Sequence, residues 1–372
     1  MATFVRCMLN MFRRKFSYNL ISAKIKTAYI TSMSLKQPTI KEIARKLNIS
    51  ISTVSRALHD HPSIGLRTKM RVKELARELD YEPNQTAIFF QQRKTFTIGV
   101  ILPELSEAFF SSAISGIEDA ANRKNYTVLL GQSHDSEQRE KQIVETMKKH
   151  RVDGLIISVA KNTENYEHFH NLKKYNIPVV FFDRIPKMES IHYVACNMES
   201  GTVQAVSFLL EKGHRIIGMI NGPDNLTASG ERLHGYMRAL KKHRLKYDPN
   251  LILSCDLTKE GTEEALKTLL SQRRKPTAIV VFNDYMVLHA VLYAQKMKLR
   301  INKDITFVSY ANLPLSNYVA YPPLASVEQF PYLQGQKATE TLLDLLDKDR
   351  DDAENNVFYR IILESQLVKN QE

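Results

Sequence analysis

The chain has 372 residues, a length that suits a small domain joined to a larger two-lobed body better than one single domain. Lys and Arg exceed Asp and Glu by 12, and the whole excess lies in residues 1–95, where 18 basic residues outnumber six acidic ones. The three cysteines (Cys7, Cys196 and Cys255) have no CxxC spacing, which argues against a disulfide framework or a zinc site and suggests a reducing cytoplasm.

Residues 1–34 hold six basic residues and no acidic one. An acid-free, Arg-rich start can mimic an organelle transit peptide, and a basic arm can also bind DNA. The apolar runs of this segment are too short and too interrupted for a secretory signal or a membrane span. We therefore expect no membrane partner.

A pair of short helices is predicted between residues 39 and 59. Thr39 and Glu42 have capping-box spacing, in which the threonine hydroxyl accepts a hydrogen bond from the backbone N–H of the third helical residue. The first helix would turn its apolar side chains inward, namely Ile43, Ala44 and Leu47. Asn48 breaks this helix, and Ser50 can cap the next one.

The second helix has two different faces. Val54, Ala57 and Leu58 lie on one side, which would pack inward. The opposite side is short, polar and basic, and consists of Ile51, Ser52, Ser55, Arg56 and His59. A two-helix corner with such a face fits the major groove of DNA. The alternative is a solvated helix in an ordinary helical subdomain, but the basic first quarter of the chain favours DNA because neutralised phosphates release counterions.

From Phe96 onward, short apolar runs alternate with amphipathic stretches in two series, with the second starting near Cys196. Continuous apolar strands between helices predict parallel sheets covered on both faces. The predicted fold is a small all-α helix-turn-helix head and a two-lobed α/β body with parallel sheets. We assign lobe 1 to about residues 96–195 and 330–350, and lobe 2 to about residues 196–329 and 351–372. The tail from Pro331 predicts a helix, a charged loop and one last strand.

Candidate ligand-binding residues follow the predicted strands of the body. Ligands of open α/β sheets bind beyond the carboxyl ends of the strands. That rule selects Phe109-Phe110, Asp183-Arg184, Asn221-Gly222-Pro223 and Asn283-Asp284. Such groups suit sugar-like or purine-like molecules through bidentate hydrogen bonds and ring stacking. Simpler roles stay open: Asp183 capping its loop, Asn283 holding the turn into the next helix, and both phenylalanines packing in the core.

No Ser/His/Asp set, metal-ligand cluster or phosphate-binding loop has supporting spacing. We therefore predict no catalytic residues, no cofactor and no metal. His168 and His170 have no nearby ligand set and are expected on a solvated helix, while His214 is assigned to loop structure.

A series of ordered motifs runs from Thr39 almost to the C-terminus. They read ISTVSRALHDHPSIGLRTKMRVKELARELDYEPN, FTIGVILPE, VDGLIIS, IPVVFFDR, EKGHRIIGMINGP, ERLHGYMRAL, FNDYMVLHAV and PPLASVEQ. Together these motifs resemble the lactose-repressor (LacI/GalR) family of bacterial transcription regulators. The resemblance implies a body like the type I periplasmic-binding proteins and a tail that crosses both lobes.

By this resemblance the second helix lies in the major groove of DNA. The family's motif there matches Ser50, Ile51, Ser52, Thr53, Ser55 and Arg56, and His59 lies on the same face. Ile51, Ser52 and Arg56 would set the sequence preference, and Arg56 is the candidate for a guanine contact. Thr39 and Ser50 would contact phosphate.

Residues 83–95 correspond to the family's hinge helix and linker, which orders on the operator and inserts an apolar wedge into the minor groove. Asn84 can cap this short helix. Phe90 stands where the family usually has leucine, and an inserted phenylalanine ring can replace lost base stacking. The alternative is that Phe89 and Phe90 pack against the body.

The resemblance places a small-molecule effector between the lobes, with Asp183, Arg232 and Asn283 as its principal contacts. The secondary contacts are Phe109, Phe110, Asn312 and Gln329. Arg232 matches the family's R-x-x-G spacing, and Gly235 would allow close packing behind it. Many relatives carry G-Y-D-D where this chain has Ser309-Tyr310-Ala311-Asn312, so one carboxylate is missing. A sugar, a sugar acid and a sugar phosphate all stay open as effectors.

The sequence thus predicts a bacterial, cytoplasmic and nucleoid-associated transcriptional regulator, a repressor by family default, that binds double-stranded operator DNA as a homodimer. Two identical heads match a palindromic site. The C-terminal segment shows no leucine heptad of the kind that would form a tetramer, so we expect a dimer. Family members begin close to Met33, so we expect translation to start there, with residues 35–82 as the head and 96–372 as the body. A solute-binding protein is a competing class, against which the basic helix-turn-helix argues.

Overall fold

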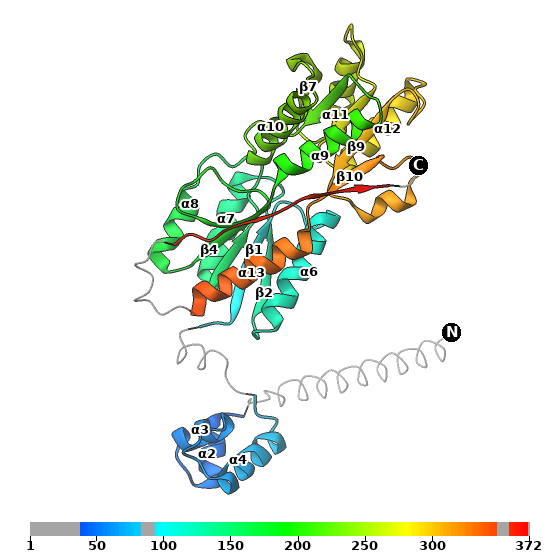
Figure 1. Ribbon diagram of the computed structural model, residues 1–372. Helices are drawn as coiled ribbons and strands as arrows, with labels where there is room; N and C mark the ends of the chain where they lie inside the picture. Colours follow the sequence, from blue (N-terminus) through cyan, green and yellow to red (C-terminus); the bar gives the residue numbers. More distant parts are fainter. Residues whose placement is uncertain (1–37, 83–93, 348–356, 371–372) are drawn as a thin grey trace, which may run out of the picture. The chain divides into compact units, whose positions relative to one another are not determined.

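The computed structural model describes residues 38–82, 94–347 and 357–370. The chain divides into two compact units, Met1–Gln92 and Arg93–Glu372 (Figure 1). We call the described part of the first unit the head and that of the second unit the body. The predictions made for residues 1–34, for Asn84 and for Phe90 lie outside the described residues.

The head consists of three short helices around a small apolar core. They are α2 (Ile40–Leu47), α3 (Ile51–Leu58) and α4 (Leu66–Glu78). Ile43, Val54 and Val72, one from each helix, are fully buried in this core. The predicted helix pair and its inward apolar face are therefore confirmed, and α4 covers the remaining side.

The corner between α2 and α3 depends on two polar residues. Asn48 ends α2 with a φ of 52°, in the left-handed region that asparagine tolerates. Ser50 caps α3 as predicted, since its hydroxyl accepts a hydrogen bond from the Thr53 N–H at 3.0 Å. The predicted capping box is wrong. Within the described residues the Thr39 side chain makes no capping bond, and only its carbonyl accepts from the Glu42 N–H, at 2.9 Å.

Lobe 1 is a parallel sheet with helices on both faces. Its strand order is β11-β5-β4-β3-β1-β2, formed by β1 (Thr97–Leu102), β2 (Thr127–Gln132), β3 (Gly154–Ile157), β4 (Val179–Phe182), β5 (His192–Cys196) and β11 (Arg360–Leu363). The helices are α6 (Ala108–Asn122), α7 (Glu137–Lys149), α8 (Glu167–His170), η1 (Asn171–Tyr175) and α13 (Pro331–Asp347). Separate apolar clusters cover the two faces, which is why its central strands read as continuous apolar runs.

Lobe 2 repeats this plan. Its strand order is β12-β10-β9-β8-β6-β7, formed by β6 (Ile217–Asn221), β7 (Ile252–Ser254), β8 (Ala278–Val281), β9 (Thr306–Tyr310), β10 (Ala325–Glu328) and β12 (Gln366–Lys369). The helices are α9 (Met198–Glu211), α10 (Thr227–Lys242), η2 (Pro249–Leu251), α11 (Lys259–Ser271), α12 (Asp284–Lys296) and η3 (Pro314–Tyr318). Only β12 runs antiparallel to its neighbour among the described strands. The predicted two-lobed α/β body is confirmed.

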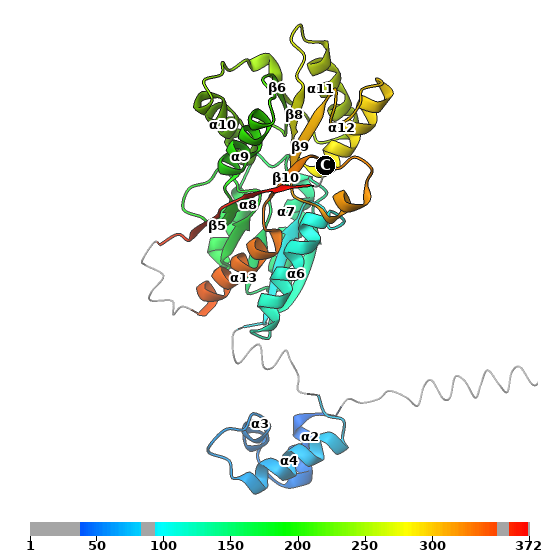
Figure 2. The same ribbon diagram turned by 45° about the vertical axis from the view of Figure 1, so that its right-hand side comes forward.

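The C-terminal tail passes from one lobe to the other (Figure 2). β11 pairs in parallel with β5 of lobe 1, and β12 pairs with β10 of lobe 2. The assignment of residues 351–372 to lobe 2 with one strand is therefore wrong in part, because Arg360–Leu363 extends the lobe 1 sheet. An apolar run does not reveal which of two nearby sheet edges a short strand joins.

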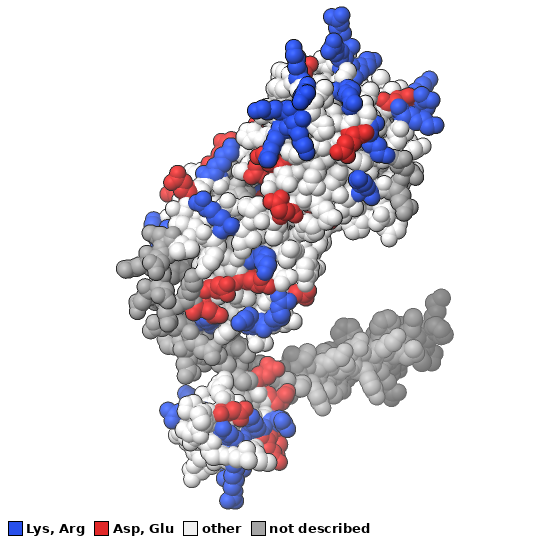
Figure 3. Space-filling model, in the orientation of Figure 1, with Lys and Arg blue, Asp and Glu red and all other residues white. Residues whose placement is uncertain are grey.

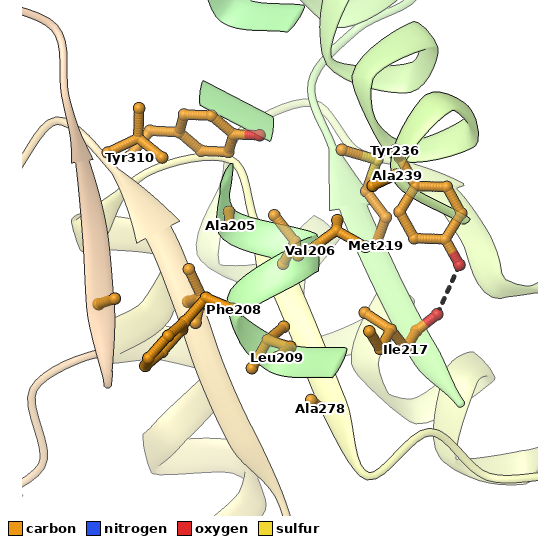
Figure 4. Close-up of a cluster of buried hydrophobic side chains, with 14 of the residues drawn as sticks. Ala205, Val206, Phe208, Leu209, Ile217, Met219, Tyr236, Ala239, Ala278 and Tyr310 are labelled. Carbon is orange, nitrogen blue, oxygen red and sulfur yellow. Dashed lines mark hydrogen bonds between the residues drawn. The ribbon is translucent and has the colours of Figure 1, made fainter. Parts of the chain in front are cut away.

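The apolar core within lobe 2 explains why α9 and α10 lie close together. Val206 and Leu209 of α9 pack toward β6, and the hydroxyl of Tyr236 on α10 donates to the Ile217 carbonyl at 2.7 Å (Figure 4). Gly235 permits this approach. A Cβ there would lie 2.4 Å from the Glu199 carbonyl oxygen, so the predicted close packing behind Arg232 is confirmed.

The expectation of a solvated His168 is wrong. Its side chain is 7% exposed, and its Nε2 lies 3.0 Å from Oε1 of Glu140, a fully buried carboxylate on α7. Glu140 also accepts from the Ala160 N–H at 2.8 Å and from the Thr163 hydroxyl at 2.9 Å. These bonds hold the loop after β3 against α7. His170, in contrast, is exposed.

Candidate functional site

A cavity of about 500 Å³ lies between the two lobes of the body. Segments that follow β1, β2, β3 and β4 contribute its wall in lobe 1, and segments that follow β6, β8, β9 and β10 contribute its wall in lobe 2. The carboxyl ends of both sheets therefore face the cavity, as the strand-end rule predicts. A volume of this size suits a small organic ligand.

The structure brings six of the seven predicted effector contacts to this cavity: Phe109, Phe110, Asp183, Arg232, Asn283 and Gln329. Asn312 is not among its lining residues. Its side-chain amide donates to Oε2 of Glu328 at 2.8 Å, and its backbone N–H donates to Oγ of Ser326 at 2.9 Å. Asn312 therefore fixes the loop after β9, whereas its neighbour Ala311 lines the cavity.

Arg232 is a buried cation with unused donors. Its residue is 3% exposed, and its guanidinium lies 3.9 Å from the ring centre of Phe282 and 4.2 Å from that of Tyr310. One amino group reaches Sδ of Met198 at 3.7 Å, while Nε and Nη1 have no partner among the described residues. Burial lowers the pKa of Arg232, and the nearby Tyr310 and Asp183 oppose that effect. An unpaired buried guanidinium is costly, which indicates a missing acceptor.

Asp183 lies across from Arg232 in the wall that lobe 1 provides. Its φ of 59° is in the left-handed region, so the chain turns sharply where β4 ends. Its Oδ2 accepts from the Ser158 hydroxyl at 3.3 Å. Burial raises the pKa of Asp183, against the lowering effect of Arg184 and Arg232. Asp183 thus holds its loop only weakly and presents a carboxylate to the cavity.

Asn283 holds the turn into α12, as the simpler alternative from the sequence has it, and also belongs to the cavity wall. Its side-chain oxygen accepts from the Met286 N–H at 2.9 Å and so caps α12, and the residue also lines the cavity. Asp284 is different, because it is 1% exposed and its carboxylate accepts from the Ser326 hydroxyl at 2.8 Å and the Leu313 N–H at 2.6 Å. Asp284 therefore fastens the loop after β9 to α12 and has a structural role.

The two adjacent phenylalanines belong both to the core and to the cavity wall. Phe109 is 7% exposed and Phe110 1% exposed, and their rings meet edge to face at 5.3 Å between centres. The guanidinium of Arg184 lies 5.8 Å from the centre of the Phe110 ring. A ligand in the cavity would contact the edges of rings that are already held in place.

Several charged residues of the cavity wall were missed from the sequence. Asp135 follows β2 and pairs with Arg184 at 2.5 Å, and Lys161 follows β3. Glu107 and Glu231 also face the cavity, and burial raises the pKa of each. Applying the strand-end rule to β2 and β3 would have found Asp135 and Lys161. In total, five carboxylates line the cavity against three cationic side chains: Glu104, Glu107, Asp135, Asp183 and Glu231 against Lys161, Arg184 and Arg232.

Hydrogen bonds cross the cavity from one lobe to the other. Lys161 donates from Nζ to the Asp256 carbonyl at 3.0 Å, and the Asn225 amide donates to the Lys161 carbonyl. The Thr227 hydroxyl also donates to the Ile185 carbonyl at 3.3 Å. On the other side, the Ala108 N–H donates to the Tyr285 hydroxyl at 3.3 Å. These contacts depend directly on the angle between the lobes.

The outward face of α3 has the composition that was predicted for it. Ser50, Ile51, Ser52, Arg56 and His59 are exposed, while Thr53 and Ser55 are half-buried, and Thr39 before α2 is exposed. Ile51 is 46% exposed and lies beside the exposed Ser52 on this face. Within the described residues Arg56 has no ion pair, whereas Asp60 is bound by Lys73 at 2.6 Å. This face can therefore present a free guanidinium to a polyanion.

Two features that mark other classes of protein are absent from the described residues. Within residues 38–82, 94–347 and 357–370, no set of three or more His, Cys, Asp and Glu side chains is placed to hold a metal ion. In the same part of the chain, no helix combines the length and the apolar character that crossing a bilayer requires.

Two protein families match the two units. "Bacterial regulatory proteins, lacI family" matches residues 39–84, and "Periplasmic binding proteins and sugar binding domain of LacI family" matches residues 95–361. Together these matches cover the head and nearly the whole body.

Relatives of known function match over most of their own length. Catabolite control protein A of Priestia megaterium is 33% identical over 85% of this chain and 94% of that protein. The transcriptional repressor CytR of Escherichia coli (strain K12) is 31% identical over 82% and 89%, respectively. The transcriptional repressor PurR of Vibrio atlanticus is 30% identical over 84% and 93%.

Solved structures show the same architecture. The lac repressor dimer bound to operator and the anti-inducer ONPF superposes with a TM-score of 0.76 at 25% identity, covering 90% of this chain and 98% of that one. The complex of the transcriptional regulator CelR with cellobiose superposes with a TM-score of 0.67 at 25% identity, covering 89% and 98%.

Proposed function

The chain belongs to the LacI family of DNA-binding bacterial transcription regulators, which are not enzymes, and on that premise we propose that it is a repressor controlled by a small molecule in the cavity between its lobes. It binds a palindromic operator as a homodimer, with one α3 in each half-site. Arg56 contacts a base edge, helped by Ile51 and Ser52, and the exposed Thr39 and Ser50 contact phosphate. Asn84 and Phe90 belong to the proposed hinge.

Arg232 is the observation that carries the proposal of effector control. Its Nε and Nη1 lack partners among the described residues, although the side chain is buried between two rings. A ligand oxygen in the cavity would satisfy these donors with charge-assisted hydrogen bonds. Asp183 and Asn283 supply an acceptor and a second polar group at the same cavity, and Phe109, Phe110 and Gln329 bound it.

The charges of the cavity wall narrow the chemistry of the effector. Five carboxylates outnumber three cations there, and the pair between Arg184 and Asp135 at 2.5 Å leaves four carboxylates against two cations. A phosphate or carboxylate on the ligand would lie near Glu107 and Glu231, acidic side chains that form no ion pair within the described residues. We therefore favour an uncharged polyhydroxylated molecule over a sugar acid or a sugar phosphate. The neighbour CelR, which was solved with cellobiose, agrees with this class of ligand.

A homodimer requires an apolar interface on the surface of the body. Tyr318, on η3, is 88% exposed, and Tyr321 nearby is 41% exposed. Two large exposed aromatic side chains are typical of an interface between proteins. We propose that they contribute to the contact between the two bodies.

DNA titrations test the proposal directly. Arg56→Ala should weaken binding to a selected operator duplex by about 1–3 kcal/mol, while random duplex is affected much less. Arg77→Ala on α4 is the matched control, since it removes the same charge from an exposed position outside the reading face. Equal losses of operator affinity in the two variants would contradict the assignment of α3 to the major groove.

Thermal-shift measurements test the effector. A panel of neutral sugars, sugar acids and sugar phosphates is added to the full-length protein. A ligand at 100 times its Kd should add about 2.7 kcal/mol of stability. We expect this only for neutral sugars. Stabilisation by a phosphate alone would refute the charge argument, and stabilisation that survives Arg232→Met would refute the site.

A further inference from the structure

A second charged surface lies on the body, away from the cavity. The loops that precede β6, β7, β8 and β9 share the amino edge of the lobe 2 sheet, because these strands are parallel neighbours in the order β7-β6-β8-β9. Taken together with the last one or two residues of the helix before each of them, and with η2, they comprise residues 211–216, 241–251, 271–277 and 296–305. Figure 3 shows Lys and Arg side chains gathered at the end of the body where the lobe 2 loops lie in Figure 1. We call this surface the distal basic row.

The charge of the distal basic row is large for a body that is neutral overall. Its four loops hold 13 basic and three acidic residues. The remainder of residues 96–372 holds 21 basic and 31 acidic residues. The body therefore carries strong positive charge at this end and net negative charge over the rest, an arrangement that steers a polyanion to the row.

Most cations of the row are free. Within the described residues, nine of its exposed side chains form no ion pair: Lys241, Lys242, Arg244, Lys246, Arg273, Arg274, Lys275, Lys298 and Lys303. Arg300, which is bound to Asp304 at 2.7 Å, is an exception. Cations near helix C-termini complement the helix dipole, but that effect is confined to the last turn. Arg273, Arg274 and Lys275 follow the end of α11 at Ser271 and are not accounted for by it.

The row is linear, and its length matches a stretch of DNA backbone. Adjacent strands lie about 4.8 Å apart, so four neighbouring loops extend over roughly 15 Å. One strand of a DNA duplex passes about four phosphates over that distance. The exposed apolar side chains within the row are Tyr247 and Met297. An interface with an acidic protein would require a larger apolar centre, whereas phosphate neutralisation requires only cations.

The row and the first described residues of the body are at opposite ends of the body. The Thr95 N–H donates to Oδ1 of Asp153 at 2.8 Å, and Asp153 directly precedes β3. The body thus begins at the amino edge of the lobe 1 sheet, while the row occupies the amino edge of the lobe 2 sheet (Figure 2). The cavity, at the carboxyl edges of both sheets, separates them.

We propose that the distal basic row is a second, sequence-independent binding site for the phosphodiester backbone of duplex DNA. It would add a salt-dependent term to every DNA complex of this regulator and would let one dimer hold a further DNA segment besides its operator. The site would read no bases, because no helix of the row is placed to enter a groove and its cations contact the phosphates only.

The salt dependence of DNA binding tests the proposal. Full-length protein is titrated with a random-sequence 40-bp duplex at a series of salt concentrations, and the slope of log Kobs against log salt is measured. In the test variant Lys241, Arg244, Arg273 and Arg274 are changed to Gln. If all four contact phosphate, the slope becomes shallower by about three to four. The matched control changes Lys124, Lys149, Lys173 and Lys174 of lobe 1 to Gln, which removes the same charge from exposed positions.

Each result decides the question. A shallower slope in the test variant alone supports the row, and a variant with Lys241, Lys242, Lys246 and Lys298 changed to Arg should keep the parent slope. Equal slopes in the parent and the test variant overturn the proposal, as does an equal change in the control. Retained duplex binding with lost binding of poly-L-glutamate would assign the row to an acidic protein and also overturn it.

Discussion

Arg232 offers a sharp test, because its removal should harm function without harming the fold. Each of its two unpartnered buried donors costs about 1–3 kcal/mol. Stacking between Phe282 and Tyr310 offsets part of this cost, at about 2 kcal/mol for a desolvated cation–π contact. Methionine fills a similar volume and keeps favourable contacts with both rings. We therefore expect Arg232→Met to leave the free energy of unfolding unchanged or to raise it by about 1–2 kcal/mol.

The same substitution should abolish most effector affinity. Two charge-assisted hydrogen bonds at about 1.5 kcal/mol each correspond to a loss of roughly 100-fold in Kd. Urea denaturation of the unliganded variant measures the first effect, and thermal shifts with a panel of mono- and disaccharides, cellobiose included, measure the second. Arg238→Met on the same helix is the control, since Arg238 is exposed and pairs with Glu199 at 2.9 Å. A loss of more than 2 kcal/mol in unliganded Arg232→Met would show that the guanidinium stabilises the fold and refute the reasoning.

Other predictions concern the packing and titration of the body. Gly235→Ala should lower the free energy of unfolding by about 1–3 kcal/mol, because its Cβ would lie 2.4 Å from a backbone oxygen of α9. At Gly230 on the same helix an added Cβ has no atom within 4 Å, so Gly230→Ala should raise the free energy of unfolding by up to about 1 kcal/mol. Urea denaturation measures both changes. Because the pKa of Asp183 is raised in the folded protein, its contribution to the free energy of unfolding is largest below about pH 4 and is lost as the pH rises through the folded-state pKa. Asp183→Asn should therefore make the free energy of unfolding fall less over this pH range. The same pH profile in the variant and the parent would contradict this prediction. Glu140→Gln should destabilise lobe 1 by about 2 kcal/mol, since the buried carboxylate accepts from three donors; a change within 0.5 kcal/mol in calorimetry would rule this out.

Much of the fold could be predicted because caps and apolar runs are local features of the sequence. Ser50 caps α3 three residues before its bonding partner, and the apolar runs of β1 and β8 are buried on both faces. The tail could not be assigned in the same way. Residues 360–363 and 366–369 are equally short, and only the three-dimensional approach of two sheet edges decides which sheet each one joins.

The cavity was predictable where one residue closely follows a strand. Asp183 directly follows β4 and Asn283 comes two residues after β8, and both line the cavity. Ala311 and Asn312 show the limit of that rule. Both have positive φ values, 89° and 46°, so the backbone reverses there and turns Ala311 to the cavity and Asn312 away from it. A sequence pattern with a period of two or 3.6 residues carries no information about such a turn.

The pairing of charges was the least predictable feature. Asp135 and Arg184 are separated by 49 positions and meet only because β2 and β4 end at the same edge of the lobe 1 sheet. The sequence showed a body with equal numbers of acidic and basic residues. Folding separates these charges into an acidic cavity and a basic end. Net charge per domain is thus a poor guide to the local field that a ligand meets.

The division of contacts between the lobes constrains how an effector can act. Asp183 belongs to lobe 1, whereas Arg232 and Asn283 belong to lobe 2. A ligand shifts a conformational equilibrium only by its difference in affinity for the two states, and moving the ratio from 1:99 to 99:1 requires about 5.5 kcal/mol. The contacts across the cavity, such as Lys161 with Asp256, each contribute about 1 kcal/mol and change with the same lobe angle. An effector held by one lobe alone would bind without altering DNA affinity, so control requires a molecule that engages Arg232 and Asp183 together.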